Sequence, residues 1–330
     1  MRTLFSVVIP LFNKGNFISD CIKSAVAQEF DDYEIIVVDD GSTDGGAEVA
    51  KRFSSRLVRL ITQKNAGVAA ARNTGIAHAS FDWIAFLDAD DLWAPWHLST
   101  LREAVRAAPE VVGVAAISAP VPLGFALSEV PSHGDGAAAQ VEVINYFKRA
   151  ARDVTVFHTS SAAVRRGRLE DIGGFRNHKV GQDQECWVRV FLNNSCGVVA
   201  RKTAFYRQDT GGAMDKLRAR ADTHPRDATM ATISPAVSTL DGLLREGLVS
   251  DADVGGVCLY IDSRIAKCAV RLAQERQIEM VKQVLALIGK YRINRFYLLK
   301  IMASIPGNIS VVFLCAFVRR VRWIRSKVRR

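Results

Sequence analysis

The feature that most constrains the fold is a series of apolar runs without polar alternation, separated by segments with helical spacing. The runs cover residues 5–10, 33–38, 57–62 and 82–87. Strands of this kind are buried on both faces, which is typical of a parallel sheet covered by helices on each side. The intervening segments predict helices over 17–28, from about 44, and over 67–79. The pattern therefore predicts an α/β fold with a mostly parallel sheet flanked by helices.

The second half of the chain is less regular. Residues 117–140 are rich in proline and glycine and are expected to form a long loop. Further elements are expected as a strand at about 154–164, a turn at 173–175, a helix from near 182 and a strand at 197–206. Strand signals stop after residue 214. We therefore expect one domain over 1–214 and a helical C-terminal region over 215–330.

Acidic residues follow two of the predicted strands at the point where each strand ends. Asp39 follows the second run, and Asp88, Asp90 and Asp91 follow the fourth. Ligands of open α/β sheets bind beyond the carboxyl ends of the strands. Crowded carboxylates need a compensating cation or a bound proton, and Mg²⁺ or Mn²⁺ takes one or two of them while leaving positions for phosphate oxygens. The alternative, for each motif taken alone, is a capped turn or helix start with solvated carboxylates.

Arg72 stands out within the alanine-rich segment 67–79. A guanidinium at this place is suited to contacting a diphosphate, because it forms charge-assisted hydrogen bonds with phosphate oxygens. A solvated surface arginine is the alternative.

Taken together, four segments carry a family resemblance: SVVIPLFNKGNFISDCIKSAVAQ, YEIIVVDDGSTD, NAGVAAARNTGIAHA and WIAFLDADDLW. Their order and spacing resemble the family 2 glycosyltransferases, which have the GT-A fold. The resemblance is strong over residues 4–105 and continues more loosely to about 205. It implies an inverting enzyme that uses a nucleotide-diphosphate sugar and a divalent cation.

The resemblance also implies roles for individual residues on the donor side. Pro10 and Asp39 would line the nucleoside pocket, and Arg72 would lie beside the nucleotide. Asp88 and Asp90 would be the metal ligands, with Asp88 nearer the ribose. Asp91 would contribute on the donor side of the same site.

Inversion by direct displacement requires a base for the proton of the acceptor hydroxyl. In the family this base is an aspartate in a later motif that opens a helix, and VGQDQECWVRV at 180–190 supplies that motif here. Asp183 would be the base and Glu185 would contact the acceptor. Gln182 stands where the family often has glutamate. Without the upstream motifs, Asp183 would be interpreted as a helix cap.

The positive charge of the chain is confined to its C-terminal tail. The formal net charge is +10, and residues 281–330 hold twelve Lys or Arg and no Asp or Glu, which leaves −2 for the rest. Residues 301–318 carry no charge, but Pro, Gly and Asn at 306–308 interrupt this apolar stretch. A basic amphipathic pattern follows it. Such a helix is suited to an anionic membrane surface. The alternative is a docked helix with a solvated basic face. Nucleic acid is not an expected partner, because no aromatic platform accompanies the charge.

These features predict a cytoplasmic enzyme, peripheral to the inner face of the cytoplasmic membrane. It would transfer a sugar from a UDP-sugar to a hydroxyl of a polysaccharide or lipid-linked oligosaccharide. Scattered cysteines agree with a reducing compartment. One alternative is a metal-dependent nucleotidyltransferase, although PLFNKGNF is a poor match to a triphosphate loop. The other is a non-catalytic nucleotide-sugar-binding membrane protein, which would be expected to have lost a catalytic carboxylate.

Overall fold

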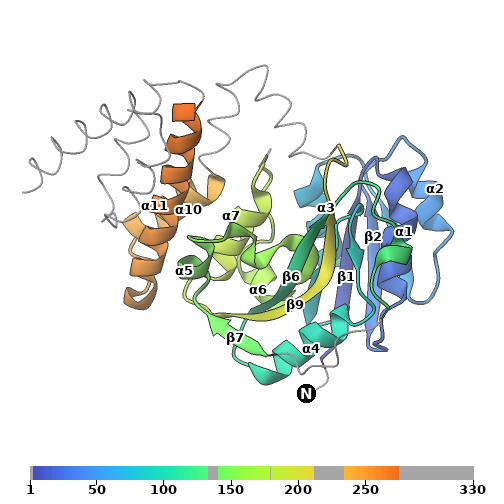
Figure 1. Ribbon diagram of the computed structural model, residues 1–330, viewed down its shortest axis with the longest axis horizontal. Coiled ribbons are helices and arrows are strands. Elements are labelled where there is room, and N and C mark those ends of the chain that lie inside the picture. The colour runs from blue at the N-terminus through green and yellow to red at the C-terminus, as the bar shows by residue number, and fades with distance from the viewer. Residues whose placement is uncertain (1–2, 133–139, 179, 212–233, 275–330) are drawn as a thin grey trace, which may run out of the picture. The chain divides into compact units, whose positions relative to one another are not determined.

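The computed structural model of the 330-residue chain describes residues 3–132, 140–178, 180–211 and 234–274. Its contacts divide the chain into one unit over Met1–Asp215 and a second over Lys216–Arg330. The described strands all belong to the first unit, and the second contributes helices α10 (Pro235–Arg245) and α11 (Asp251–Gln274) (Figure 1). The uncharged segment 301–318 and the basic tail lie outside the described residues.

The first half of the sheet confirms the prediction of parallel strands. Four strands pair in parallel in the order β3-β2-β1-β4, with bounds β1 (Phe5–Leu11), β2 (Tyr33–Asp39), β3 (Val58–Thr62) and β4 (Trp83–Phe86). The helices between them are α1 (Gly15–Val26), α2 (Gly46–Lys51) and α3 (Val68–Ala77). Each crossover from one parallel strand to the next thus includes a helix, as parallel pairing requires.

The second half of the nine-stranded sheet is mixed. Its order continues β8-β6-β9-β5, while β7 also pairs with β9; the bounds are β5 (Leu92–Trp93), β6 (Gly113–Val121), β7 (Val141–Ile144), β8 (Ala162–Arg165) and β9 (Cys196–Arg207). Strand β8 runs antiparallel to both β4 and β6, whereas β6 and β9 are parallel.

Two sequence predictions for this half are wrong. Strand β6 extends into the expected loop at 117–140, and most of the expected strand at 154–164 consists of short 3₁₀ turns, η2 (Val154–Phe157) and η3 (Thr159–Ser161).

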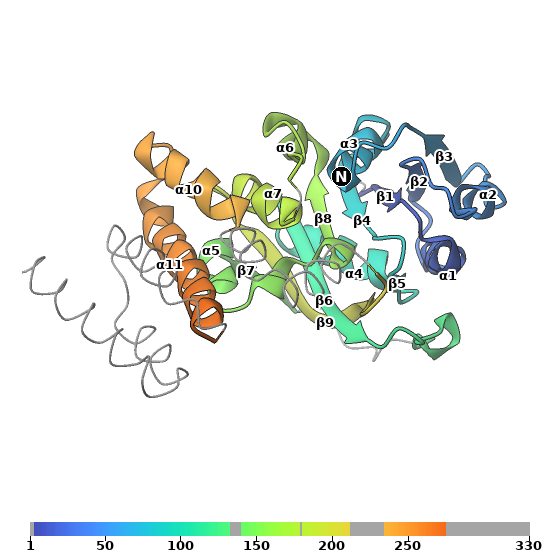
Figure 2. The same cartoon turned by 90° about the horizontal axis from the view of Figure 1, so that it is seen from above.

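Helices cover both faces of the sheet (Figure 2). On one face, alternate residues of β1 such as Val7 and Ile9 pack in a core with α1 and with α4 (His97–Ala107). On the other face, Val8 lies so close to α3 that a Cβ added at Gly75 would be 2.3 Å from Val8 Cγ1. Phe86 packs there against Phe175 and against Trp187 of α7 (Gln182–Val190). Both faces are therefore apolar, which explains the lack of polar alternation along these strands.

The strand register brings the predicted strand-end residues to one edge of the sheet. Leu11 is opposite Asp39, and Val8 is opposite Phe86. The backbone N–H of Asp40 donates to the carbonyl of Leu11 at 2.8 Å, so the loop after β2 begins beside the end of β1. The ends of β1, β2 and β4 therefore lie side by side. No helix in the described part of the chain is long and apolar enough to cross a membrane.

Candidate functional site

Asp39, the last residue of β2, and Asp40, which follows it, have different tasks. Asp39 Oδ1 accepts a hydrogen bond of 3.0 Å from the backbone N–H of Ser42, and no described residue donates to its other oxygen. The carboxylate of Asp40 accepts from Gln63 Nε2 and from the backbone N–H groups of Ala66 and Gly67, at 2.7 to 2.9 Å. Asp40 therefore fixes the loop that leads into α3, a task that sequence reasoning missed. Pro10 is buried in β1 directly opposite Val38.

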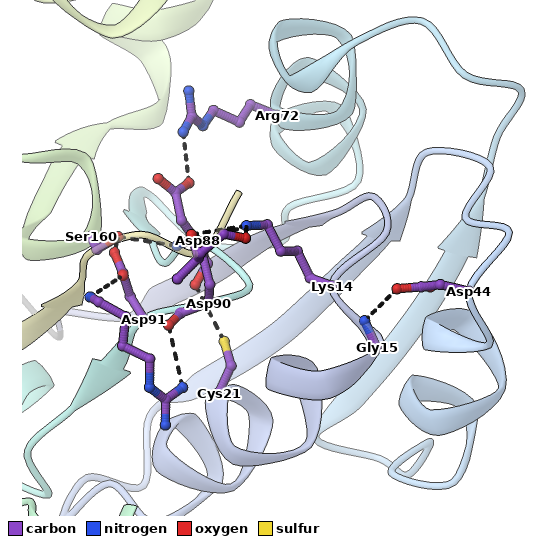
Figure 3. A network of polar contacts seen from close by, with 11 residues as sticks. Lys14, Gly15, Cys21, Asp44, Arg72, Asp88, Asp90, Asp91 and Ser160 are labelled. Carbon is purple, nitrogen blue, oxygen red and sulfur yellow. Dashed lines mark hydrogen bonds and ion pairs between the residues drawn. The ribbon is translucent and has the colours of Figure 1, made fainter. Parts of the chain in front are cut away.

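The loop after β1 is fastened to the loop after β2. The carboxylate of Asp44 accepts from the backbone N–H of Gly15 at 2.7 Å and from that of Gly46 at 2.9 Å, so it joins the starts of α1 and α2. The side chain of Asn13 accepts from the backbone N–H of Thr43 at 2.8 Å. Figure 3 shows the Gly15–Asp44 contact beside Lys14. These contacts set the position of the loop that carries Lys14.

Asp88 is compensated by an arginine from α3. Arg72 Nη2 lies 2.6 Å from Asp88 Oδ1, and the guanidinium lies over the ring of Phe175 at 5.3 Å. Arg72 is buried; burial alone would lower its pKa, but the charge of Asp88 outweighs this and raises the pKa. The structure therefore brings together two of the predicted donor-side residues.

Asp90 is compensated by Lys14, which the sequence analysis did not include. Lys14 Nζ lies 2.6 Å from Asp90 Oδ2, and the hydroxyl of Thr210 donates to the same oxygen at 2.6 Å. Lys14 also donates to the backbone carbonyl of Thr210 at 2.9 Å. The signal for Lys14 was its place in the loop after β1, since loops at the ends of adjacent parallel strands meet.

Asp91, which the resemblance placed on the donor side, has its carboxylate buried among residues of the protein. Asp91 is 0% exposed and accepts from Ser160 Oγ at 2.5 Å and from the backbone N–H of Arg207 at 3.1 Å. Burial, with the charges of Asp90 and Asp88, raises the pKa of Asp91 well above its usual value. Its carboxylate therefore faces the interior, where it ties the end of β9 to the loop before β8.

Asp183 lies in the first turn of α7 and is half-buried. Its charge is one of those that raise the pKa of Arg72, after that of Asp88. Burial lowers the pKa of His158, and Asp88 and Asp183 oppose that shift. The charges of Asp88 and Asp183 therefore both act on Arg72 and on His158.

The predicted acceptor contact of Glu185 is not supported by the structure. Glu185 is 0% exposed, and its carboxylate accepts from Arg189 Nε at 2.8 Å, from Arg189 Nη2 at 2.7 Å and from Arg176 Nη1 at 3.2 Å. Arg189 in turn donates to the carbonyls of Ile172 and Gly174. Glu185 therefore faces the protein and holds the turn that precedes α7.

Asn73 connects α3 to the same turn. Its side chain donates to the carbonyl of Phe175 and accepts from the N–H of Phe175, both at 2.8 Å. Gly174 has a φ of 66°, and a Cβ added there would lie 2.4 Å from Asn73 Oδ1, so the close approach requires glycine. Arg72, which pairs with Asp88, precedes Asn73 in α3. The contact of Asn73 therefore links α3 to the turn that leads to Asp183.

The comparison with known families agrees with this geometry. Residues 6–173 match the model of glycosyl transferase family 2. The chain belongs to this family. AglE, a glycosyltransferase of Haloferax volcanii, is 31% identical over 194 residues, which are 56% of this chain and 60% of AglE. YibD of Escherichia coli, an uncharacterized glycosyltransferase, is 44% identical over 98 residues, which are 29% of this chain and 28% of YibD. The chain thus spans less than two thirds of each of these family 2 relatives.

Solved structures show the GT-A fold of this family 2 chain. The Staphylococcus aureus TarS fragment 1–349 in complex with UDP-GlcNAc superposes with a TM-score of 0.64 at 17% identity, covering 97% of this chain and 89% of that one. The mannosyltransferase PcManGT of Pyrobaculum calidifontis, in complex with GDP-Man and Mn²⁺, gives a TM-score of 0.54 at 18% identity, covering 97% and 88%. At these identities the likeness concerns the fold.

The carboxylate oxygens of Asp88 and Asp90 fit a cation that binds together with a diphosphate. The described residues contain no group of three or more His, Cys, Asp or Glu side chains arranged to hold a metal ion. Asp88 and Asp90 supply two carboxylates, and no described residue donates to Asp88 Oδ2 or Asp90 Oδ1. Mg²⁺-type sites use one or two protein carboxylates and complete their shell with substrate phosphates and water. Two oxygens, one from each aspartate, are thus available for such a cation.

Proposed function

We propose that this chain is an inverting glycosyltransferase that moves a sugar from a UDP-sugar to a hydroxyl of a polysaccharide or lipid-linked oligosaccharide. The proposal rests on one observation above all, the Arg72–Asp88 ion pair with Asp183 close enough to act on the pKa of Arg72. These observations support a site that combines donor-side carboxylates with a separate carboxylate on α7. Membership of family 2, and TarS with UDP-GlcNAc as a fold neighbour, support the choice of donor class.

On the donor side, Asp39 accepts hydrogen bonds from the nucleobase through its open oxygen, beside Pro10. Arg72 places positive charge near the diphosphate, and Asp88 and Asp90 hold Mg²⁺ or Mn²⁺. When bound, the cation neutralises the charge that develops on the departing diphosphate. PcManGT, a fold neighbour with GDP-Man and Mn²⁺, supports this assignment.

On the acceptor side, Asp183 takes the proton of the acceptor hydroxyl as that oxygen bonds to the anomeric carbon. The bond from the anomeric carbon to the diphosphate breaks in the same displacement, so the configuration inverts. The charge of Asp183 acts on the pKa of His158 and of Arg72, and Asn73 with Arg189 keeps the preceding turn in place. The nucleotide leaves as UDP and the proton stays on Asp183 until water removes it.

The cellular setting is part of the proposal. The basic amphipathic tail supports a protein that is cytoplasmic and peripheral to the inner face of the membrane. A lipid-linked acceptor would then lie at the same surface as the enzyme.

The proposal is tested by separating binding from transfer in three variants of the full chain. UDP binding with and without Mn²⁺ is measured by calorimetry, and turnover is measured as UDP release from a panel of UDP-sugars that begins with UDP-GlcNAc. Asp183→Asn is expected to keep UDP affinity within about twofold and to lose turnover by about 10²- to 10⁴-fold, the range for a general base. Asp90→Ala is expected to lose the increase in UDP affinity that Mn²⁺ causes.

Asp171→Asn is the matched control, because this exposed aspartate ends α6 (Arg166–Asp171) and lies outside the proposed site. It is expected to match the wild type in both assays. Undiminished turnover of Asp183→Asn would remove this residue as the base. UDP affinity that responds to Mn²⁺ equally in Asp90→Ala and the wild type would remove Asp90 as a ligand.

A further inference from the structure

The ammonium group of Lys14 occupies one oxygen of a proposed metal ligand. It lies 2.6 Å from Asp90 Oδ2, contacts the carbonyl and the hydroxyl of Thr210 at 2.9 and 3.0 Å, and lies 5.6 Å from the centre of the Phe17 ring. The Thr210 hydroxyl donates to the same Asp90 oxygen. This oxygen is therefore bonded from two sides, whereas Oδ1 of Asp90 has no donor among the described residues.

The two cationic partners of the carboxylates differ in their freedom to move. Arg72 is buried, with 6% of its side chain exposed, and its planar guanidinium is confined between Asp88 and the ring of Phe175. Lys14 has 15% of its side chain exposed and a flexible stem that starts in a loop. A lysine ammonium is a compact charge on a flexible stem and is easily reoriented. An arginine guanidinium is planar, and its hydrogen bonds fix its orientation. Lys14 is thus the partner that can leave its carboxylate.

We propose that Lys14 is an exchangeable counter-ion of Asp90. It neutralises this carboxylate while the donor site is empty, and it moves to the diphosphate when a divalent cation and a nucleotide bind together. The inference rests on the proposed function, because it assumes that Asp90 is a metal ligand.

The physical reason for the exchange is repulsion between cations. A divalent cation on Asp90 would face the lysine charge at a few ångströms, and like charges at that separation repel each other. The diphosphate brings new negative charge, so it relieves the repulsion and offers Lys14 a second partner. Cation binding therefore becomes weak without nucleotide and strong with it, and the two ligands are coupled reciprocally.

The test is a titration of Mn²⁺ against the full chain, read by electron paramagnetic resonance of the free ion, without nucleotide and with UDP. Lys14→Met removes the competing charge and keeps a long apolar stem. Without nucleotide it is expected to bind Mn²⁺ about fivefold more tightly than the wild type, the loss of a competing ion pair worth about 1 kcal/mol. The tightening that UDP causes is expected to be at least about fivefold smaller in the variant, because Lys14 no longer contacts the phosphates.

Lys23→Met is the matched control. It removes the same charge from α1, but Lys23 is 53% exposed and its recorded partner is Asp20 at 3.9 Å. Screening by salt limits its effect on Mn²⁺ affinity to less than about twofold. Thr210→Val tests the same inference without changing charge: it removes one of the two donors to Asp90 Oδ2 and is expected to tighten nucleotide-free Mn²⁺ binding in the same direction.

The outcomes separate this inference from the proposed function. If wild type and Lys14→Met bind Mn²⁺ equally in both conditions, or if Lys23→Met reproduces the change, the exchange is refuted while the metal role of Asp90 stands. If no protein in the set binds Mn²⁺ even with UDP, the exchange and the metal role are refuted together. An unchanged thermal unfolding temperature of Lys14→Met excludes misfolding as the cause.

Discussion

Removal of the Glu185 carboxylate is expected to destabilise the first unit of the chain strongly. Glu185→Ala leaves the guanidinium of Arg189 buried, at 6% exposure, without the two contacts of 2.7 and 2.8 Å that neutralise it. Arg189 keeps its hydrogen bonds to the carbonyls of Ile172 and Gly174, which satisfy donors but do not cancel the charge. Breaking a buried ion pair from one side costs about 3 to 5 kcal/mol, because an uncompensated charge remains.

The measurement is urea unfolding followed by tryptophan fluorescence. Four of the five tryptophans lie in the first unit, so the signal reports mainly on it: Trp83, Trp93, Trp96 and Trp187. With a urea m-value of about 3 kcal/mol/M, a loss of about 3 to 5 kcal/mol lowers the unfolding midpoint by about 1 to 1.7 M. Arg176→Ala is the control, because Arg176 is 57% exposed and touches Glu185 at 3.2 Å. Its cost is expected to stay below about 1 kcal/mol, as for exposed ion pairs.

The result that would refute this reasoning is a Glu185→Ala midpoint within about 0.3 M of the wild type, equivalent to about 1 kcal/mol. A stable variant with selectively weakened acceptor binding would restore the acceptor contact that the sequence predicts. The two interpretations of Glu185 thus differ in which property changes, stability or acceptor affinity.

Two further predictions concern pH and the tail. Burial lowers the pKa of His97 to about 3, and its Nδ1 lies 2.6 Å from Thr203 Oγ1. Below about pH 6.5 the unfolded chain binds a proton that the folded chain excludes, so this histidine reduces the unfolding free energy by about 1.4 kcal/mol per pH unit. His97→Gln should flatten the pH dependence of the urea midpoint between pH 6.5 and 4, and an unchanged slope would contradict the burial argument. Deletion of 309–330 should move the protein from the membrane to the soluble fraction, and an unchanged distribution would favour a docked helix.

The first four strands of the sheet could be predicted because their sequences repeat one simple signal. Runs such as 33–38 are apolar on both faces and stop at an acidic residue, and a parallel register then brings their ends to one edge. Strand β6 begins in the apolar run 111–117 but continues into residues 118–121, where serine and proline favour a loop. A Cβ added at Gly113 would lie 2.9 Å from the ring of Phe191, so the close packing at this position requires glycine. Phe157, by contrast, suggested a strand but packs from a 3₁₀ turn onto Trp187.

The site residues divide in the same way. The sequence alone indicates Asp88 and Asp90, because they follow a predicted strand. It also indicates Arg72, because this residue is a single charge in an alanine-rich helix. Glu185 and Asp91 share the local pattern of a site residue, yet their carboxylates turn inward to Arg189 and to Ser160. The direction of a carboxylate depends on partners far away in sequence, 69 residues in the case of Ser160 and Asp91. Local pattern therefore finds where acids gather but does not separate those that bind ligand from those that hold the fold.

The same long-range pairing changes the explanation of the acidic cluster. From sequence, Asp88, Asp90 and Asp91 appear to need a metal ion to coexist, because the stretch itself contains no cation. In the folded chain Asp88 has Arg72, Asp90 has Lys14, and the pKa of buried Asp91 is raised by its surroundings. Two of the three carboxylates therefore have a cationic partner within the chain. On the proposed function, this leaves cation binding to be driven by the diphosphate rather than by uncompensated carboxylates, which is why the Mn²⁺ affinity of the nucleotide-free protein is the quantity that Lys14 should control.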